Sequence, residues 1–216
     1  MKLAVFDCDG TLIDGQASIC DAMEAAFASV GMALPDRNQV RRIVGLSLPQ
    51  AARRLAPDAS AQEAAQIVDA YKQAFRAARE EGSLAQPLFA GMRDVLDALT
   101  AQGWLLGVAT GMSQRGLVHC LATHGLSQRF VTLQTADHHP SKPHPAMLEQ
   151  ALSEAAAQAS DAVMIGDTAY DMQMAQSAGV RGVGVAWGYH EPDELLGAGG
   201  AFVAETPAQL LEYLLA

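Results

Sequence analysis

Four short apolar runs in this 216-residue chain are each followed by polar residues that phosphoryl-transfer chemistry can use. These residues are Asp7 and Asp9 after residues 3–6, Thr110 after residues 105–109, Asp167 and Asp171 after residues 163–166, and Lys142 in the loop after residues 130–133. In an open parallel sheet, the carboxyl ends of the strands line one crevice, and ligands bind there. If the runs are neighbouring strands, four carboxylates meet a threonine and a lysine at one point. Such a group of acids needs a cation, which predicts a Mg²⁺ site that handles a phosphate.

The bulk composition excludes several classes of protein. Half of the residues are hydrophobic, yet no apolar run reaches the roughly 18 residues of a membrane span. A net charge of −10 argues against binding to nucleic acid or to an anionic membrane. Three cysteines without paired spacing predict neither a disulfide framework nor a zinc motif. The strand that carries Asp7 begins almost at once, where a cleavable signal would stand, so we expect a cytoplasmic protein.

A long insertion separates the first two predicted strands. A crossover between parallel strands needs only about a dozen residues, but here the strands lie near residues 6 and 105. Residues 22–30 and 67–75 carry apolar stripes with helical spacing. We therefore predict a helical cap domain at 15–86, inserted into a catalytic core formed by 1–14 and 87–216.

The remainder of the chain alternates between predicted helices and strands. Helices are expected at 92–102, 113–124, 145–158, 170–178 and 207–215, and strands at 104–109, 130–134, 162–166, 182–186 and 201–204. This order is typical of an α/β protein with a parallel sheet covered by helices on both faces. The fold class is thus a doubly wound parallel sheet, a Rossmann-like core, with an inserted all-helical cap domain.

Local readings of the polar residues remain open at this point. Asp167 and Asp171 stand one helical turn apart, so both can point at one site; alternatively, Asp167 or Thr168 merely caps the following helix. Lys142 lies in a loop stiffened by neighbouring prolines, which favours a fixed position over a solvated one. Backbone N–H groups around Asp9–Thr11 and after Thr110, at Gly111, can cradle phosphate oxygens.

The joint occurrence of these motifs resembles a known family. The matching segments are Phe6-Asp7-Cys8-Asp9-Gly10-Thr11-Leu12, Ala109-Thr110-Gly111, Lys142-Pro143-His144-Pro145 and Gly166-Asp167-Thr168-Ala169-Tyr170-Asp171. In this order they are similar to the haloacid dehalogenase superfamily of hydrolases. Within that superfamily, the chain resembles the members with a helical cap after the first strand, such as phosphoglycolate phosphatases.

The resemblance implies a role for each motif residue. Asp7 would be the nucleophile that forms an aspartyl-phosphate, and Asp9 the acid for the leaving oxygen and then the base for water. Thr110 would bind a phosphoryl oxygen, while Lys142 would offset negative charge on the phosphate and the nucleophile.

The resemblance also implies the metal ligands. Asp167 would bind Mg²⁺ together with the Asp7 carboxylate and the Asp9 backbone carbonyl. Asp171 would support the metal site or Lys142.

A basic segment of the cap, residues 41–48, resembles the part that faces the active site in relatives. Arg42 or Arg41 would bind a carboxylate or second phosphate of the substrate, and Gly45 would allow close approach of the backbone. The alternative is that both arginines lie on a solvated helix face.

We therefore expect a Mg²⁺-dependent phosphatase that acts on a small phosphorylated metabolite, as a monomer or homodimer. A sugar-phosphate mutase is the first alternative, but relatives of that kind carry a cap histidine and residues 12–85 contain none. A non-catalytic binder of a phosphorylated ligand or protein partner is the second, although Asp7 and Asp9 are both present.

Overall fold

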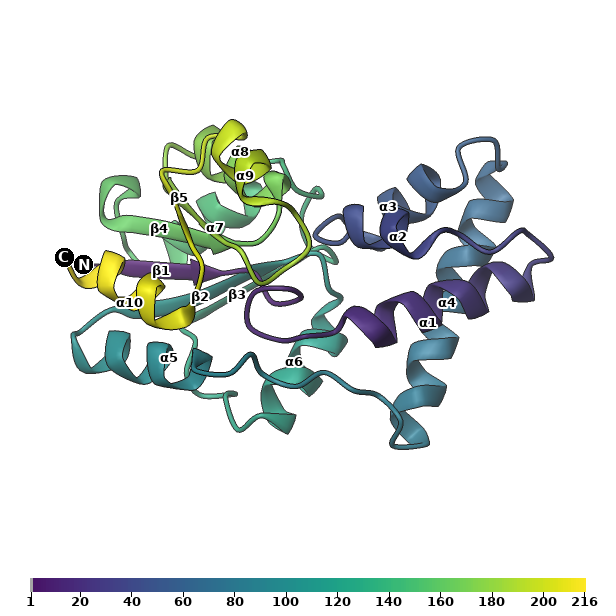
Figure 1. Ribbon diagram of the computed structural model, residues 1–216, viewed down its shortest axis with the longest axis horizontal. Coiled ribbons are helices and arrows are strands. Elements are labelled where there is room, and N and C mark those ends of the chain that lie inside the picture. Colours follow the sequence, from purple (N-terminus) through teal and green to yellow (C-terminus); the bar gives the residue numbers. More distant parts are fainter. Residues whose placement is uncertain (1) are drawn as a thin grey trace.

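The computed structural model describes residues 2–216 and contains one six-stranded parallel sheet (Figure 1). The strand order is β3-β2-β1-β4-β5-β6, and every neighbouring pair is parallel. The strands are β1 (Leu3–Phe6), β2 (Leu105–Thr110), β3 (Thr132–Thr135), β4 (Ala162–Gly166), β5 (Arg181–Val185) and β6 (Phe202–Ala204). This confirms the predicted fold class and the neighbouring positions of the strands after which Asp7, Thr110 and Asp167 were placed.

Helices cover both faces of the sheet, which explains why β1 and β4 are buried at every residue. These helices are α5 (Met92–Ala101), α6 (Gln114–Thr123), α7 (Ala146–Glu154), α8 (Ala169–Ser177), α9 (Pro192–Gly197) and α10 (Pro207–Leu215). One apolar core joins the sheet to α5, α6 and α10, and a second joins its other face to α7 and α8. The short helix α9 was not predicted, and the strand expected at 130–134 begins two residues later.

Four helices follow β1 and form a separate body beside the end of the sheet toward which β1 points (Figure 1). They are α1 (Gln16–Ser29), α2 (Arg37–Arg42), α3 (Leu48–Leu55) and α4 (Ala61–Glu80). Their apolar stripes meet in a core of their own, which includes Met23, Phe27, Val40 and Ile67. A capping box between Ser60 and Glu63 fixes the start of α4. None of the helices within residues 2–216 combines the length and apolar character needed to cross a bilayer.

Candidate active site

The sheet register brings three polar residues to one edge. Phe6 pairs with Val108 on one side and with Ile165 on the other, so Asp7, Thr110 and Asp167 emerge together. All three side chains are buried. The turn after Asp7 approaches Asp167 so closely that a Cβ at Gly10 would lie 2.2 Å from its Oδ2, and Gly10 has φ +84°. Only glycine satisfies both conditions at this turn.

Lys142 is the cation at the centre of the acidic group. Its Nζ lies 2.9 Å from Asp7 Oδ1 and 2.6 Å from Asp171 Oδ1, and the side chain is fully buried. Burial disfavours the charged amine, but Asp171 and Asp7 overcome this and raise the pKa of Lys142. Burial also raises the pKa of Asp7 to about 6, with Lys142 opposing the rise. Lys142 therefore stays charged and partly neutralises its two carboxylate neighbours.

Asp171 both caps α8 and holds Lys142. One of its oxygens accepts from Lys142, and the other accepts from the backbone N–H and hydroxyl of Thr168. Thr168 is the N-cap, and its hydroxyl accepts in turn from the Asp171 N–H. Of the two capping candidates suggested by the sequence, Thr168 is the N-cap and Asp167 is not, and Asp171 completes a capping box with Thr168. Both readings of the motif hold, with the capping role carried by Thr168 and Asp171.

Asp7, Asp167 and Asp171 offer carboxylate oxygens that all lie within 4.8 Å of one another. Thr11 and the N–H of Tyr189 donate to Asp167, at 2.7 and 3.0 Å. Burial, with the charges of Asp7 and Asp171, still raises the pKa of Asp167 well above its ordinary value. Asp7 Oδ2 is buried and has no hydrogen-bond partner among the described residues. Buried carboxylate oxygens crowded in this way, one of them without a partner, fit a hard divalent cation such as Mg²⁺.

Asp9 stands apart from the three-acid group and lines a cavity between the core and the inserted helices. Its Oδ1 is buried without a partner within residues 2–216. Burial raises the pKa of Asp9 to about 7, with the charge of Asp7 adding to the rise and Lys142 opposing it. A carboxyl with this pKa can both give and take a proton near neutral pH.

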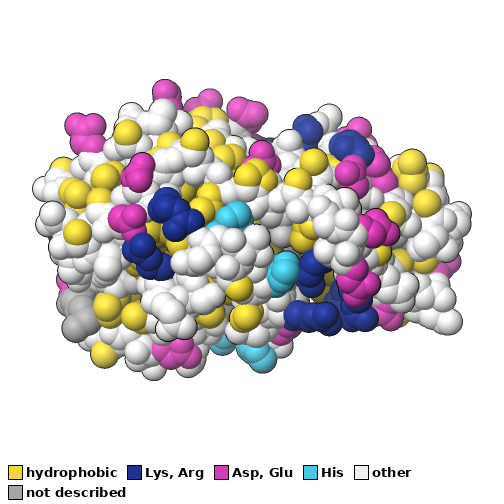
Figure 2. All heavy atoms as spheres, turned by 90° about the horizontal axis from the view of Figure 1, so that it is seen from below, with side chains coloured by type: hydrophobic (Ala, Val, Ile, Leu, Met, Phe, Trp, Pro, Cys, Tyr) yellow, Lys and Arg dark blue, Asp and Glu magenta, His cyan; other side chains and the backbone are white. Residues whose placement is uncertain are grey.

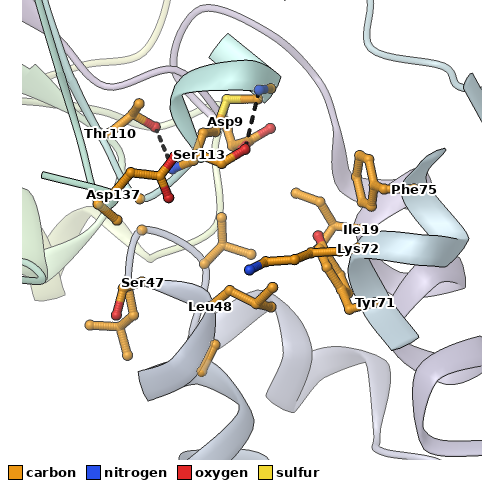
Figure 3. Close-up of a pocket in the computed structure, with 18 of the residues that line it drawn as sticks. Asp9, Ile19, Ser47, Leu48, Tyr71, Lys72, Phe75, Thr110, Ser113 and Asp137 are labelled. Carbon is orange, nitrogen blue, oxygen red and sulfur yellow. Dashed lines mark hydrogen bonds between the residues drawn. The ribbon is translucent and has the colours of Figure 1, made fainter. Parts of the chain in front are cut away.

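The cavity has a volume of about 460 Å³ and is bordered by Asp7, Asp9, Thr110 and Gly111 on the core side. Figure 3 shows Thr110 and Asp9 on one wall and Lys72, Tyr71 and Phe75 of α4 opposite them.

The loop between α2 and α3 closes one side of this cavity. A Cβ at Gly111 would lie 2.5 Å from the carbonyl oxygen of Leu46 and 2.8 Å from that of Gly45, so the two backbones meet directly. The N–H of Ser47 donates to Ser141 Oγ at 2.7 Å, next to Lys142. Gly45 thus borders the cavity next to Gly111, and its part in substrate binding stays a prediction.

The structure does not bring Arg41 and Arg42 to the cavity, where they were predicted to bind the substrate. The two terminal nitrogens of the Arg42 guanidinium donate to Glu194 of α9. The carbonyl of Arg42 accepts from Tyr170, which holds the end of α2 against the core. Arg41 donates to Asn38 on its own helix. The reason is local, because α2 ends at Arg42 and its last side chain is directed to α9.

Four other cations line the cavity and were not singled out from the sequence. They are Lys72, Arg76 and Arg79 of α4 and Arg115 of α6. The sequence contained a pattern that could have identified the three on α4, because positions 72, 76 and 79 share one face of a helix.

Comparisons with known proteins agree with this geometry. The family model of the haloacid dehalogenase-like hydrolases matches residues 4–185. A Dickeya dadantii protein named "Probable phosphatase IndB" is 34% identical over 215 residues, which cover 97% of this chain and 91% of that protein. Phosphoglycolate phosphatase of Vibrio vulnificus is 27% identical over 224 residues, covering 100% and 96%. A solved haloacid dehalogenase-like hydrolase from Streptococcus pneumoniae superposes with a TM-score of 0.86 at 25% identity, covering 99% and 98%. The chain belongs to the haloacid dehalogenase-like hydrolases.

Proposed function

We propose that this chain is a Mg²⁺-dependent phosphatase that hydrolyses a small-molecule phosphate monoester through an aspartyl-phosphate. The proposal rests on the different surroundings of the two oxygens of the Asp7 carboxylate. Oδ1 is held by Lys142 and by the N–H of Cys8, while Oδ2 has no partner within the described residues. A carboxylate fixed by one oxygen and free at the other is suited to in-line attack on phosphorus.

The reaction has two steps in this proposal. Asp7 Oδ2 forms a bond to phosphorus as the ester P–O bond breaks, and the leaving oxygen takes a proton from Asp9. Water then attacks the phosphoryl group and gives a proton to Asp9. The bond between Asp7 Oδ2 and phosphorus breaks, so phosphate is released and the Asp7 carboxylate is restored. A pKa of about 7 allows Asp9 to serve in both directions.

The other residues bind and orient the phosphoryl group. Lys142 offsets charge on Asp7 and the transferring group, and Thr110 and the N–H of Gly111 bind its oxygens. The N–H of Thr11, which the sequence also suggested for this role, donates instead to the carbonyl of Cys8. Asp7, Asp167 and the carbonyl of Asp9 would hold Mg²⁺, which would neutralise charge that builds up on the phosphoryl oxygens. Asp171 would act by positioning Lys142, because its oxygens already accept from Lys142 and Thr168.

The inserted helices would close the site during the reaction. We assign residues 15–86 to this cap and residues 1–14 and 87–216 to the catalytic core. The separate apolar core of α1–α4 supports this division, because such a body can move as a unit.

The test is the Asp7→Asn variant, assayed for phosphate release from p-nitrophenyl phosphate with Mg²⁺. An amide does not attack phosphorus, so we expect turnover to fall by about a thousandfold or more. Asp69→Asn, an exposed position on α4 outside the cavity, makes the same charge change and should retain full activity. Circular dichroism of each variant checks the fold. Normal turnover by folded Asp7→Asn would refute the proposal.

A further inference from the structure

One face of α4 combines aromatic and basic side chains along the cavity. Tyr71 and Phe75 stand four residues apart with ring centroids 5.0 Å from each other. Lys72, Arg76 and Arg79 follow the same helical spacing, and all five border the cavity. Figure 3 shows Lys72 extending from α4 into the middle of the cavity, between Leu48 and the wall that carries Asp9.

None of these cations forms an ion pair with a carboxylate among the residues that the structure describes. The ion pairs among residues 2–216 use Arg37, Arg42, Arg129 and Lys142 instead. Arg79 Nε is buried and donates to no partner within that range. Arg115 of α6 joins Lys72, Arg76 and Arg79 at the cavity, although the whole chain has 14 Lys and Arg residues and a net charge of −10. Figure 2 shows basic side chains gathered beside a hollow at the junction of the two halves of the molecule.

The electrostatic effect of the group reaches its neighbours. Burial, followed by Arg79 and Arg115, lowers the pKa of His119 on α6, which is the response of an imidazole to nearby positive charge. Asp137 lies on the core side of the cavity, as Asp7 and Asp9 do, and its Oδ2 accepts a hydrogen bond from the N–H of Gln114. An anion bound between these walls would relieve the repulsion among the α4 cations.

The size of the cavity also bears on the ligand. A volume of about 460 Å³ lies in the range of roughly 300–1,000 Å³ found for sites that enclose ligands of drug size. Apolar side chains border the cavity beside these cations, among them Ile19, Leu48, Tyr71 and Phe75. A phosphate ester bound at Asp7 would therefore place its organic group against these apolar side chains.

We infer that the substrate is a phosphate monoester whose organic part contains a flat apolar ring and a second anionic group, bound by Lys72 and Arg76. The inference rests on the proposed phosphatase activity and assigns specificity to α4 instead of to Arg41 and Arg42. The second anion is a carboxylate or a second phosphate, since either accepts charge-assisted hydrogen bonds from lysine and arginine.

Binding is measured first, in the Asp7→Asn background with Mg²⁺, so that turnover does not interfere. The ligands are 4-carboxyphenyl phosphate, 1,4-phenylene bisphosphate and 4-carbamoylphenyl phosphate, whose second substituent is uncharged, titrated by calorimetry. We expect the better of the two ligands with a second anionic group to bind about tenfold more tightly than the carbamoyl ester, which is the effect of one charge-assisted hydrogen bond. Which of the two binds better identifies the second anion as carboxylate or phosphate.

Variants then assign the preference to α4. Lys72→Met and Arg76→Gln should each remove most of the tenfold preference and leave the affinity for the carbamoyl ester nearly unchanged. Arg53→Gln is the matched control, because it removes one exposed cap charge away from the cavity and should keep the preference. Equal affinity for all three ligands, or equal loss on the charged and neutral ligands in Lys72→Met, would overturn the inference.

Turnover of the same esters by the unmodified enzyme tests the proposed activity separately. A preference in binding without any phosphate release would overturn the phosphatase proposal and support the anion site. Phosphate release without a binding preference for the second anionic group would support the phosphatase proposal and overturn the anion site.

Discussion

We predict that Lys142→Met lowers the free energy of unfolding by about 3–5 kcal/mol, because it removes one partner from a buried ion-pair group. Lys142 is fully buried and lies 2.9 Å from Asp7 and 2.6 Å from Asp171. Its loss leaves carboxylates without the only cation that contacts them among the described residues. For a chain of this length, the expected fall in melting temperature is roughly 6–20 °C.

The loss of stability should depend on pH in a defined direction. Lys142 opposes the rise of the Asp7 pKa, so in the variant that pKa moves above its present value of about 6. An acid whose folded pKa is raised destabilises the fold above that pKa, and this cost disappears as the pH falls below it. The deficit of Lys142→Met should therefore shrink between about pH 8 and pH 5.5.

The measurement is urea unfolding of metal-free protein at both pH values, followed by fluorescence and circular dichroism. Lys72→Met is the control, since Lys72 is exposed and its replacement should change stability by about 0.5 kcal/mol or less. Lys142→Met/Asp171→Asn should recover part of the loss, because the two groups are coupled. A variant Lys142→Met as stable as the parent, or a deficit that grows on acidification, would refute the reasoning.

Three further outcomes are expected. Mg²⁺ should raise the melting temperature of the parent but not of Asp167→Asn, measured by differential scanning fluorimetry, because in the proposed site the ion would bind the folded state through this carboxylate. Ca²⁺ should compete with Mg²⁺ yet support little phosphate release, while Mn²⁺ should partly replace Mg²⁺. The reason is that the larger Ca²⁺ would readily take both oxygens of Asp7. Full activity with Ca²⁺ would contradict this expectation. Glu194→Gln should cost at most about 1 kcal/mol, because its ion pair with Arg42 is largely exposed. Arg42 lowers the pKa of Glu194 to about 2, so the contribution is present above pH 4.5 and is lost as the pH falls toward 2 in acid unfolding.

The sheet and the residues at its carboxyl edge could be predicted from the amino-acid sequence alone. Residues 3–6 and 163–166 are continuous apolar runs, which is what strands covered on both faces require. In a parallel sheet, residues after the strands meet at one edge, so Asp7, Thr110 and Asp167 could be predicted to converge before any contact was known. The helical insertion could also be predicted, because its apolar residues recur with a helical period.

Short-range patterns did not reveal α9. It has six residues, begins at Pro192 and carries one buried apolar residue, Leu195, so no amphipathic period develops over its length. Its Glu194 is nevertheless the partner of Arg42. The contact of Arg42 could therefore not be predicted, because its partner lies on α9, a helix that the sequence pattern did not indicate.

Long-range packing determines which groups face one another. Lys142 lies between Asp7 and Asp171, residues distant in sequence, and no local rule divides its contacts between them. Likewise, the rotation of α4 about its own axis follows from its packing on α1, and that rotation turns Lys72 and Arg76 toward the cavity. Periodicity states which residues share a face of a helix, whereas long-range packing determines what that face meets.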